Sequence, residues 1–317
     1  MSSELDQNPA WYQKGPFRVS SELFLDVVFT SRCDCTCPWC IARTPEYARE
    51  DPAAWEQAVR DAFRLFRIRN VIILGGEATV DPRFRAKLDF ITREMEGKKT
   101  EHLILTTNGN RLKDPAFLAM ILDSRIDAVN LSRMHYLQRE NDRIFGRATL
   151  TREEIRELYE KLKESGRTLR INVNVWRGNL DTPEEMEAFV SAFAGACDAI
   201  KFTPLMRTDM FGTLPEVTEC AARLAIDEKE IAALWNAFAA RHALRRKNSR
   251  VLGFVDYAET EVSGQTVILK YAQVEDKYDR DRDIPTLKLY PNGCLSNEWS
   301  FTKDIRTRLP AQGGLPG

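Results

Sequence analysis

The sequence lacks the features that mark membrane, secreted and nucleic-acid-binding proteins. No apolar run approaches the roughly 20 residues that a membrane-spanning helix needs. The segment Met1–Gly15 lacks the basic-then-apolar pattern of a signal peptide. Lysine and arginine number 46 against 47 aspartates and glutamates, so no basic excess exists to attract nucleic acid or an anionic membrane. These absences predict a cytoplasmic protein with no membrane or nucleic-acid partner.

Cysteine is scarce outside one short stretch. Cys197, Cys220 and Cys294 are isolated, whereas four cysteines fall within the segment CDCTCPWC at 33–40. A secreted chain would be expected to carry dispersed pairs that form disulfides, so crowded thiols in a cytosolic chain indicate a metal site. Only one cysteine follows Cys220, and this argues against an auxiliary cluster, because such a cluster would need about four further thiolates.

The crowded segment holds Cys33, Cys37 and Cys40 in the spacing C-x3-C-x2-C, and Trp39 stands just before the last cysteine. Three thiolates this close can hold three irons of a [4Fe–4S] cluster and leave the fourth iron open for chemistry. A zinc site is the alternative, since Cys35 offers a fourth thiol. Zinc sites usually join two separated ligand pairs, however, and no partner pair occurs elsewhere in the sequence. The spacing therefore favours an iron–sulfur cluster.

The chain from residue 23 to about residue 205 alternates β-type runs with helical patterns. The expected strands are 23–30, 71–74, 103–105, 127–131, 169–175 and 199–202. Such alternation predicts parallel strands joined by helical crossovers. Six units, less the last helix, are too few for an eight-fold barrel, so we expect an α/β fold built on a partial (β/α)6 TIM-like barrel. Ligands of such sheets bind beyond the carboxyl ends of the strands.

The remaining segments flank this expected barrel. They are an N-terminal segment (1–22) and a small C-terminal α+β extension (206–309), with a helix over 227–243 and β-type runs at 250–257, 266–272 and 286–290. The turn signal at 291–293 predicts a hairpin over 287–295. The charge run at 275–283 is expected to be solvated and mobile, and the Gly/Pro-rich tail at 310–317 to be disordered. We expect the extension to cover the open mouth of the barrel and to determine specificity.

Short polar motifs follow or line the expected strands. Gly75 and Gly76 would let backbone approach a ligand closely, and the Glu77 carboxylate could pair with an ammonium group. A tight strand-to-helix turn would explain the same residues. One face of the fifth strand carries Arg170, Asn172 and Asn174. Polar side chains inside a barrel need partners, because burying each unpaired costs about 1–3 kcal/mol, so either a polar ligand or solvent must face them.

The cysteine loop, the Gly-Gly-Glu motif and the polar residues after the later strands resemble, in their order along the chain, the motifs of the radical S-adenosylmethionine (SAM) superfamily. The resemblance covers residues 23 to about 205. It implies that Cys33, Cys37 and Cys40 bind the cluster, that Cys35 is not a ligand, and that the Gly-Gly-Glu motif contacts the SAM amino group. Ala78 departs from the proline that the family usually has here. The residues that the resemblance places at or near SAM are Trp39, Gly75, Gly76, Glu77, Asn108, Ser132, Arg170, Asn174 and Leu205.

The resemblance also implies an activity. SAM on the open iron would be cleaved reductively to methionine and a 5′-deoxyadenosyl radical, and this radical would abstract a hydrogen atom from an unactivated C–H bond. A reductase, flavodoxin or ferredoxin would supply the electron. His135 and Tyr136 follow the fourth strand, at the expected mouth of the barrel, and are the candidate catalytic residues. For His135, a substrate contact or proton donor stands beside the alternative of a satisfied loop histidine.

The motifs do not identify the substrate. Peptide-modifying relatives usually carry an N-terminal leader-binding domain or auxiliary clusters, and only about 20 residues precede the first expected strand. We therefore expect a small polar metabolite of natural-product biosynthesis, with a ribosomal peptide as the alternative. A non-catalytic, metal-stabilised binding protein would not need the Gly-Gly-Glu motif together with Ser132. A methyltransferase that uses SAM without a radical would not need the three cysteines.

Overall fold

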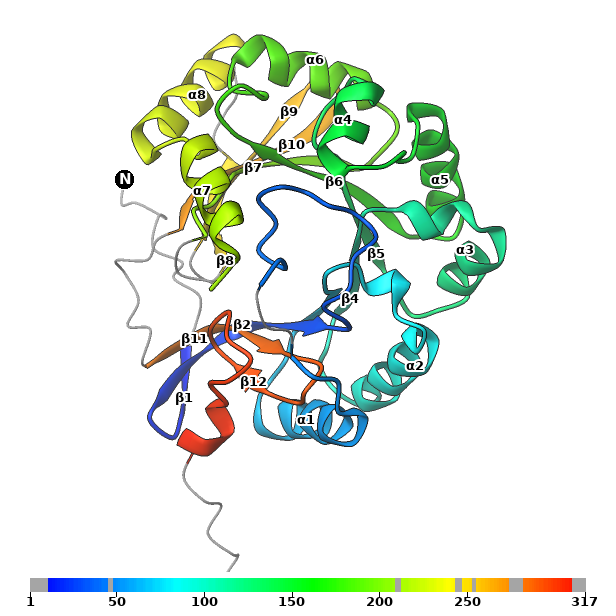
Figure 1. Cartoon of the computed structure of the whole chain (residues 1–317), viewed down its shortest axis with the longest axis vertical. Coiled ribbons are helices and arrows are strands. Elements are labelled where there is room, and N and C mark those ends of the chain that lie inside the picture. Colours follow the sequence, from blue (N-terminus) through cyan, green and yellow to red (C-terminus); the bar gives the residue numbers. More distant parts are fainter. Residues whose placement is uncertain are drawn as a thin grey trace, which may run out of the picture.

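One continuous sheet organises the molecule (Figure 1). The computed structural model describes residues 11–44, 48–208, 212–242, 247–252, 255–273 and 282–309. Its strand order is β12-β11-β2-β3-β4-β5-β6-β7-β10-β9-β8, with β1 paired to β2. The six strands expected from the sequence are all present and adjacent in chain order: β2 (Phe17–Val28), β3 (Asn70–Leu74), β4 (His102–Thr107), β5 (Ala128–Ser132), β6 (Thr168–Val175) and β7 (Ala199–Pro204). Every neighbouring pair among them is parallel, as a partial barrel requires.

Helices cover the outer face of this sheet (Figure 1). They are α1 (Pro52–Leu65), α2 (Phe84–Met95), α3 (Pro115–Leu122), α5 (Arg152–Glu164) and α6 (Pro183–Phe193). The short α4 (Gln138–Phe145) instead packs Ile144 and Phe145 into an apolar cluster with Trp39. Local sequence explains their starts, because Thr151 and Glu154 form a reciprocal capping box and the Thr182 side chain accepts from Glu185 N ahead of Pro183. The short α4 was missed at the sequence level, since its eight residues bury only one narrow stripe.

Alternation along the strands separates an apolar face from a polar one. In β6, every second residue lies in the main hydrophobic core beneath the helices, namely Leu169, Ile171, Val173 and Val175. The intervening side chains are half-buried and face the inside of the barrel. Helices therefore pack on a continuous apolar surface, while the interior of the barrel keeps polar groups available.

The C-terminal region continues the same sheet at both edges. It contains α7 (Pro215–Leu224), α8 (Glu228–Arg241), β8 (Lys247–Leu252), β9 (Val255–Val262), β10 (Gln265–Gln273), β11 (Asp283–Leu289), β12 (Leu295–Ser296) and a 3-10 turn, η5 (Ile305–Arg308). Strand β10 pairs in parallel with β7, and β11 pairs in parallel with β2. The expected hairpin is confirmed, because β11 and β12 are antiparallel. The described sheet thus has two more parallel strands than the six expected, and the extension is built into the barrel.

The start of the chain also differs from expectation. The first barrel strand begins at Phe17 rather than at Leu23, and β1 (Trp11–Lys14) pairs with its first half. The sequence did not indicate this, because Arg18, Ser20 and Glu22 interrupt the apolar pattern there. The tail at 310–317 and most of the charge run at 275–283 lie outside the described residues. No helix in the described part is both long and apolar enough to span a membrane.

Candidate functional site

The loop with the four crowded cysteines leaves the carboxyl end of β2 and crosses the middle of the ring of strands (Figure 1). Asp34 fixes its first turn. The Asp34 carboxylate accepts hydrogen bonds from Asn108 Nδ2 at 2.6 Å and Asn110 Nδ2 at 3.5 Å, and it forms an ion pair with Arg147. Farther along, Thr36 N donates to Phe145 O at 2.9 Å. Residues after β4 and after α4 therefore hold the cysteine loop in place.

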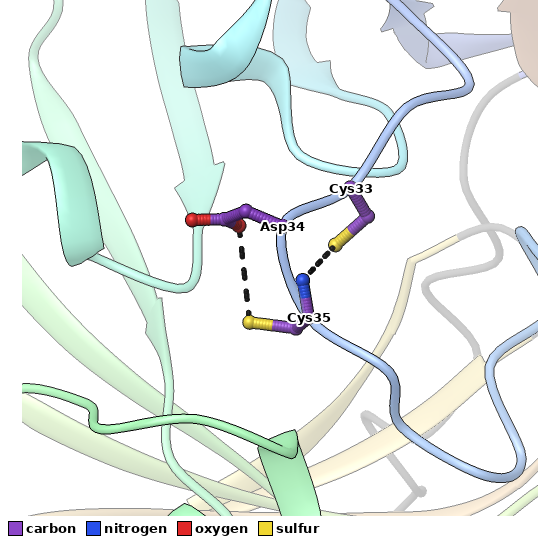
Figure 2. Close-up of side chains that lie close together, drawn as sticks. All are labelled: Cys33, Asp34 and Cys35. Carbon is purple, nitrogen blue, oxygen red and sulfur yellow. Dashed lines mark hydrogen bonds between the residues drawn. The ribbon is translucent and has the colours of Figure 1, made fainter.

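The sulfur atoms of Cys33 and Cys35 point to different neighbours (Figure 2). Cys33 Sγ accepts from Cys35 N at 3.4 Å, whereas Cys35 Sγ lies 3.2 Å from Asn108 Nδ2 and 3.8 Å from an Asp34 carboxylate oxygen. Among the described residues, the donor atoms of Cys33, Asp34 and Cys35 form a group within 4.8 Å, and no such group includes Cys37 or Cys40. The four sulfurs of this loop do not converge on one point, as a tetrahedral zinc ion would require.

A cluster makes a different demand, because each of its irons takes its own thiolate. Cys33, Cys37 and Cys40 lie within eight residues on one loop. Burial raises the pKa of Cys37 to about 12 and also raises the pKa of Cys40. The side-chain hydrogen bond with Cys35 lowers the pKa of Cys33. Three neighbouring thiols on one loop fit a [4Fe–4S] cluster, and loading it would release their protons.

A small apolar cluster shields one side of the loop. Trp39 is buried and stacks on Trp176, with ring centroids 4.3 Å apart and planes inclined by 47°. Phe145 and Leu205 belong to the same cluster, and Cys37 packs against it. Leu205 N donates to Val175 O at 2.8 Å, which extends the strand pairing by one residue. The sequence-predicted residues Trp39 and Leu205 therefore meet at the cysteine loop, and their contact with SAM stays a prediction.

The two glycines after β3 allow the cysteine loop to approach. A Cβ on Gly75 would lie 2.5 Å from Thr30 O, and a Cβ on Gly76 would lie 2.3 Å from Arg32 O. Gly76 N donates to Thr30 O at 2.8 Å, and Glu77 N donates to Arg32 O at 2.7 Å. Backbone packing of one loop on the other is enough to require glycine at both positions.

The Glu77 carboxylate is directed into the protein. One oxygen accepts from Thr79 N at 3.1 Å, Thr79 Oγ1 at 2.7 Å and Thr107 Oγ1 at 2.7 Å, and the other accepts from Asn108 N at 2.6 Å. Burial raises the pKa of Glu77, although the hydrogen bonds from Asn108, Thr79 and Thr107 act in the opposite direction. Glu77 thus ties the loop after β3 to the loop after β4. Its predicted contact with an ammonium group has to compete with four protein donors.

The expected residues of β5 and β6 lie side by side inside the barrel. Ser132 is paired in register with Asn172, and Asn174 is paired with Thr203 of β7. Arg170 Nε donates to Asn172 Oδ1 at 3.1 Å. All three predicted β6 residues are half-buried on the inward face. The register places Asn172 beside Ser132, and the roles of Arg170, Asn174 and Ser132 toward SAM stay predictions.

His135 and Tyr136 follow β5 and stack on each other, with centroids 4.5 Å apart. His135 Nδ1 accepts from Leu137 N at 2.9 Å, so this nitrogen serves a local turn. Burial lowers the pKa of His135. A neutral His135 would carry its proton on Nε2, and the catalytic role predicted for it and for Tyr136 stays a prediction.

Several residues of the site were missed at the sequence level. On the loops these are Asp34, Asn110 and Arg147, and in the barrel they are Asp26, Lys201, Lys270 and Lys288. Lys201 and Lys270 carry a signal that could have been recognised, because each is the single charge of its strand. Arg147 carries none, since only the fold brings it to the cysteine loop.

Comparison with known proteins agrees with this geometry. The model of the Radical SAM superfamily matches residues 27–192. GTP 3′,8-cyclase of Rhizobium meliloti is 30% identical over 112 residues, which is 34% of this chain and 32% of that protein. The enzyme of the same name from Ectopseudomonas mendocina is 32% identical over 127 residues, 39% of this chain and 37% of that protein. The matched stretch thus spans about a third of the length of these curated relatives.

Solved structures show the same fold. Streptococcus suis SuiB bound to S-adenosylmethionine superposes with a TM-score of 0.60 at 15% identity, over 90% of this chain and 65% of that one. SuiB bound to its precursor peptide SuiA gives 0.58 at 15% identity, over 92% and 65%. The family model covers more than half of this chain, and the family uses a [4Fe–4S] cluster together with SAM. The chain belongs to the radical SAM superfamily and is an enzyme.

Proposed function

We propose that this enzyme abstracts a hydrogen atom from a small polar metabolite. The observation that carries the proposal is the polar interior of the barrel, directly below the strand ends that hold the cysteine loop. Asn130, Arg170, Asn172, Asn174 and Lys201 project from three adjacent strands onto the inward face. Some of these groups bind one another, since Asn130 Nδ2 donates to Thr106 Oγ1 and Arg170 Nε to Asn172 Oδ1. Such a polar lining can offer further hydrogen bonds to a compact polar substrate.

The cluster and SAM, when bound, supply a 5′-deoxyadenosyl radical. The task of the chain is to position the substrate and to exclude water and competing C–H bonds. We assign Cys33, Cys37 and Cys40 as cluster ligands, and Cys35 as a non-ligand that contacts Asn108. Trp39, with its apolar neighbours, would keep water from one side of the cluster.

A ribosomal peptide is the alternative substrate. SuiB was solved with a precursor peptide, but its 15% identity supports only a common fold. The curated relatives act on GTP, as their name states, and their similarity covers about a third of this chain. Nucleotides therefore belong in the first substrate panel, beside amino acids and sugars.

The first test is anaerobic reconstitution with iron and sulfide, followed by SAM and dithionite, with 5′-deoxyadenosine quantified. Wild type should show cluster absorbance and form 5′-deoxyadenosine. The Cys33→Ala/Cys37→Ala/Cys40→Ala variant should do neither, whereas Cys35→Ala should retain both. Cys220→Ala, outside the loop, is the matched control.

Substrate class is tested by following deuterium from carbon-bound positions of candidate substrates into 5′-deoxyadenosine. Extract of cells grown in D2O on a deuterated carbon source is divided into a peptide-free ultrafiltrate and a peptide fraction, and each is offered to the reconstituted enzyme with unlabelled SAM. Deuterium transfer into 5′-deoxyadenosine from the ultrafiltrate alone would support a small metabolite. Transfer from the peptide fraction alone would overturn the proposal in favour of a peptide modifier.

A further inference from the structure

Charged side chains gather on the inward face of the barrel, on strands from both ends of the sequence. Asp26 lies on β2, Arg170 on β6, Lys201 on β7, Lys270 on β10 and Lys288 on β11. Each alternates with apolar residues that are fully buried on the helix side, such as Leu25, Phe202 and Leu269. These charges are therefore features of the barrel interior and not of the outer surface.

Strand register divides the charges into two groups. Lys288 is paired with Asp26, so a carboxylate accompanies this lysine, which also donates to Thr286 Oγ1 at 3.1 Å. Lys201 is paired with Ile268, two residues before Lys270 on the same face of β10. Asn172 is the partner of Lys201 on the other side, two residues after Arg170. The second group, defined here as the cation group, consists of Arg170, Lys201 and Lys270.

Lys270 is the most informative member of the cation group. Its residue is only 9% exposed. Its ammonium has no hydrogen bond or ion pair with any residue in the described part of the chain. Burial lowers the pKa of Lys270 to about 8. Burial, together with the charges of Arg170 and Lys270, also lowers the pKa of Lys201, and the charge of Asp26 acts in the opposite direction. Asp26 therefore offsets part of the repulsion at Lys201, whereas the buried Lys270 ammonium would be stabilised by a bound anion.

We propose that the cation group of Arg170, Lys201 and Lys270 binds an oxyanion of the substrate, either a carboxylate or a phosphate. The inference rests on the proposed function, whose substrate class it narrows from polar to anionic. Three cationic donors from adjacent strands converge on one region, and charge-assisted hydrogen bonds to an oxyanion would satisfy the buried ammonium. The oxyanion anchors the substrate inside the barrel, below the loops that would hold SAM.

Direct binding tests this site without relying on catalysis. Inorganic phosphate, pyrophosphate and acetate are titrated calorimetrically into the cluster-loaded protein, at constant ionic strength. Saturable binding of the phosphates alone indicates a phosphorylated substrate, and binding of acetate as well indicates a carboxylate. Lys270→Met and Lys201→Met should each weaken binding about tenfold or more, because each removes a charge-assisted bond. Lys161→Met, an exposed lysine at the end of α5, should leave it unchanged.

Stability separates a binding role from a structural one. Because Lys270→Met replaces a buried cation by an apolar side chain of similar length, it should raise the Tm while it weakens anion binding. A lower Tm together with unchanged phosphate affinity would overturn the proposal and assign Lys270 a structural role. Equal affinity in wild type and in both lysine variants would also overturn it.

The pH dependence provides a second readout. Binding should weaken between pH 7 and pH 9, as Lys270 loses its proton, and should take up protons in that range. The charged groups around it are Lys201, Arg170, Asp26 and Lys288, and Asp26 is ionised throughout this range. If 5′-deoxyadenosine forms but no anion binds, the inference fails and the proposed function stands. If anions bind but SAM is never cleaved, the anion site stands and the proposed function fails.

Discussion

Replacing Glu77 by glutamine separates two roles for the Gly-Gly-Glu motif. One Glu77 oxygen accepts three hydrogen bonds and the other accepts one, from Asn108 N at 2.6 Å. In Glu77→Gln, the amide oxygen can keep the first set, but its NH2 group then faces the Asn108 N–H. Two buried donors in opposition cost about 1–3 kcal/mol. Burial already raises the pKa of Glu77, so loss of the charge itself adds little to this cost.

The expected result is a fall in Tm of about 2–6 °C, at roughly 2 °C per kcal/mol for a chain of this size. Thermal unfolding of the anaerobically reconstituted protein measures it, and SAM affinity is determined by equilibrium binding on the same sample. Glu157→Gln, an exposed carboxylate on α5 with no described partner, is the control and should leave both quantities unchanged. An unchanged Tm in Glu77→Gln, combined with about tenfold weaker SAM binding, would refute the structural role and assign the carboxylate to the SAM amino group.

Three further predictions concern the loops and the barrel. Gly76→Ala should prevent cluster loading, measured by iron content, because the added Cβ would lie 2.3 Å from Arg32 O. The control is Gly166→Ala, where a Cβ meets open space but φ is positive. This control should lower the free energy of unfolding by only about 1 kcal/mol and should load the cluster normally. Arg147→Met should change the free energy of unfolding by no more than about 1 kcal/mol, because the ion pair with Asp34 is partly exposed. It should nevertheless lower the apparent affinity for iron roughly tenfold in a competition with a chelator. Equal iron retention in the variant and wild type would contradict this prediction. Burial raises the pKa of Asp26 from 3.8 to about 6, so its contribution to stability is full below pH 4 and is lost as the pH rises to 6, by about 3 kcal/mol. The Tm of Asp26→Asn should therefore rise relative to that of wild type as the pH increases from 4 to 6. Parallel Tm profiles of the two proteins over this range would contradict a raised pKa of Asp26.

Local patterns were sufficient to predict the six central strands, because each is a short β-type run followed by a helix with a visible start. Thr151 with Glu154 and Thr182 with Pro183 mark two such starts in the sequence and in the structure. The pairing of β10 with β7 and of β11 with β2 could not be predicted in this way. Those contacts join segments far apart in the chain, and no local pattern states which strand edge a later strand will meet.

The residues of the candidate site could likewise be predicted only in part from local sequence patterns. The spacing of Cys33, Cys37 and Cys40 identified the cofactor, since one short loop carries all three thiols. The spacing could not show that Glu77 binds Asn108, or that Asn108 in turn binds Asp34, because these residues come from three separate loops. Lys201 of β7 and Lys270 of β10 come together only after the fold has placed their strands side by side.

The contacts that hold the cysteine loop differ in energetic weight, and this difference has a consequence. Asn108 donates to Glu77 in a buried setting, where a hydrogen bond is costly to lose, whereas the Arg147 guanidinium that pairs with Asp34 is partly exposed. The ends of β3 and β4 therefore fix the position of the loop, through the hydrogen bonds of Glu77 and Asn108. Arg147 acts as a weaker clamp from the far side. Because these contacts involve only protein atoms, substitutions at Glu77, Asn108 and Arg147 test how the loop is held without removing a cluster ligand.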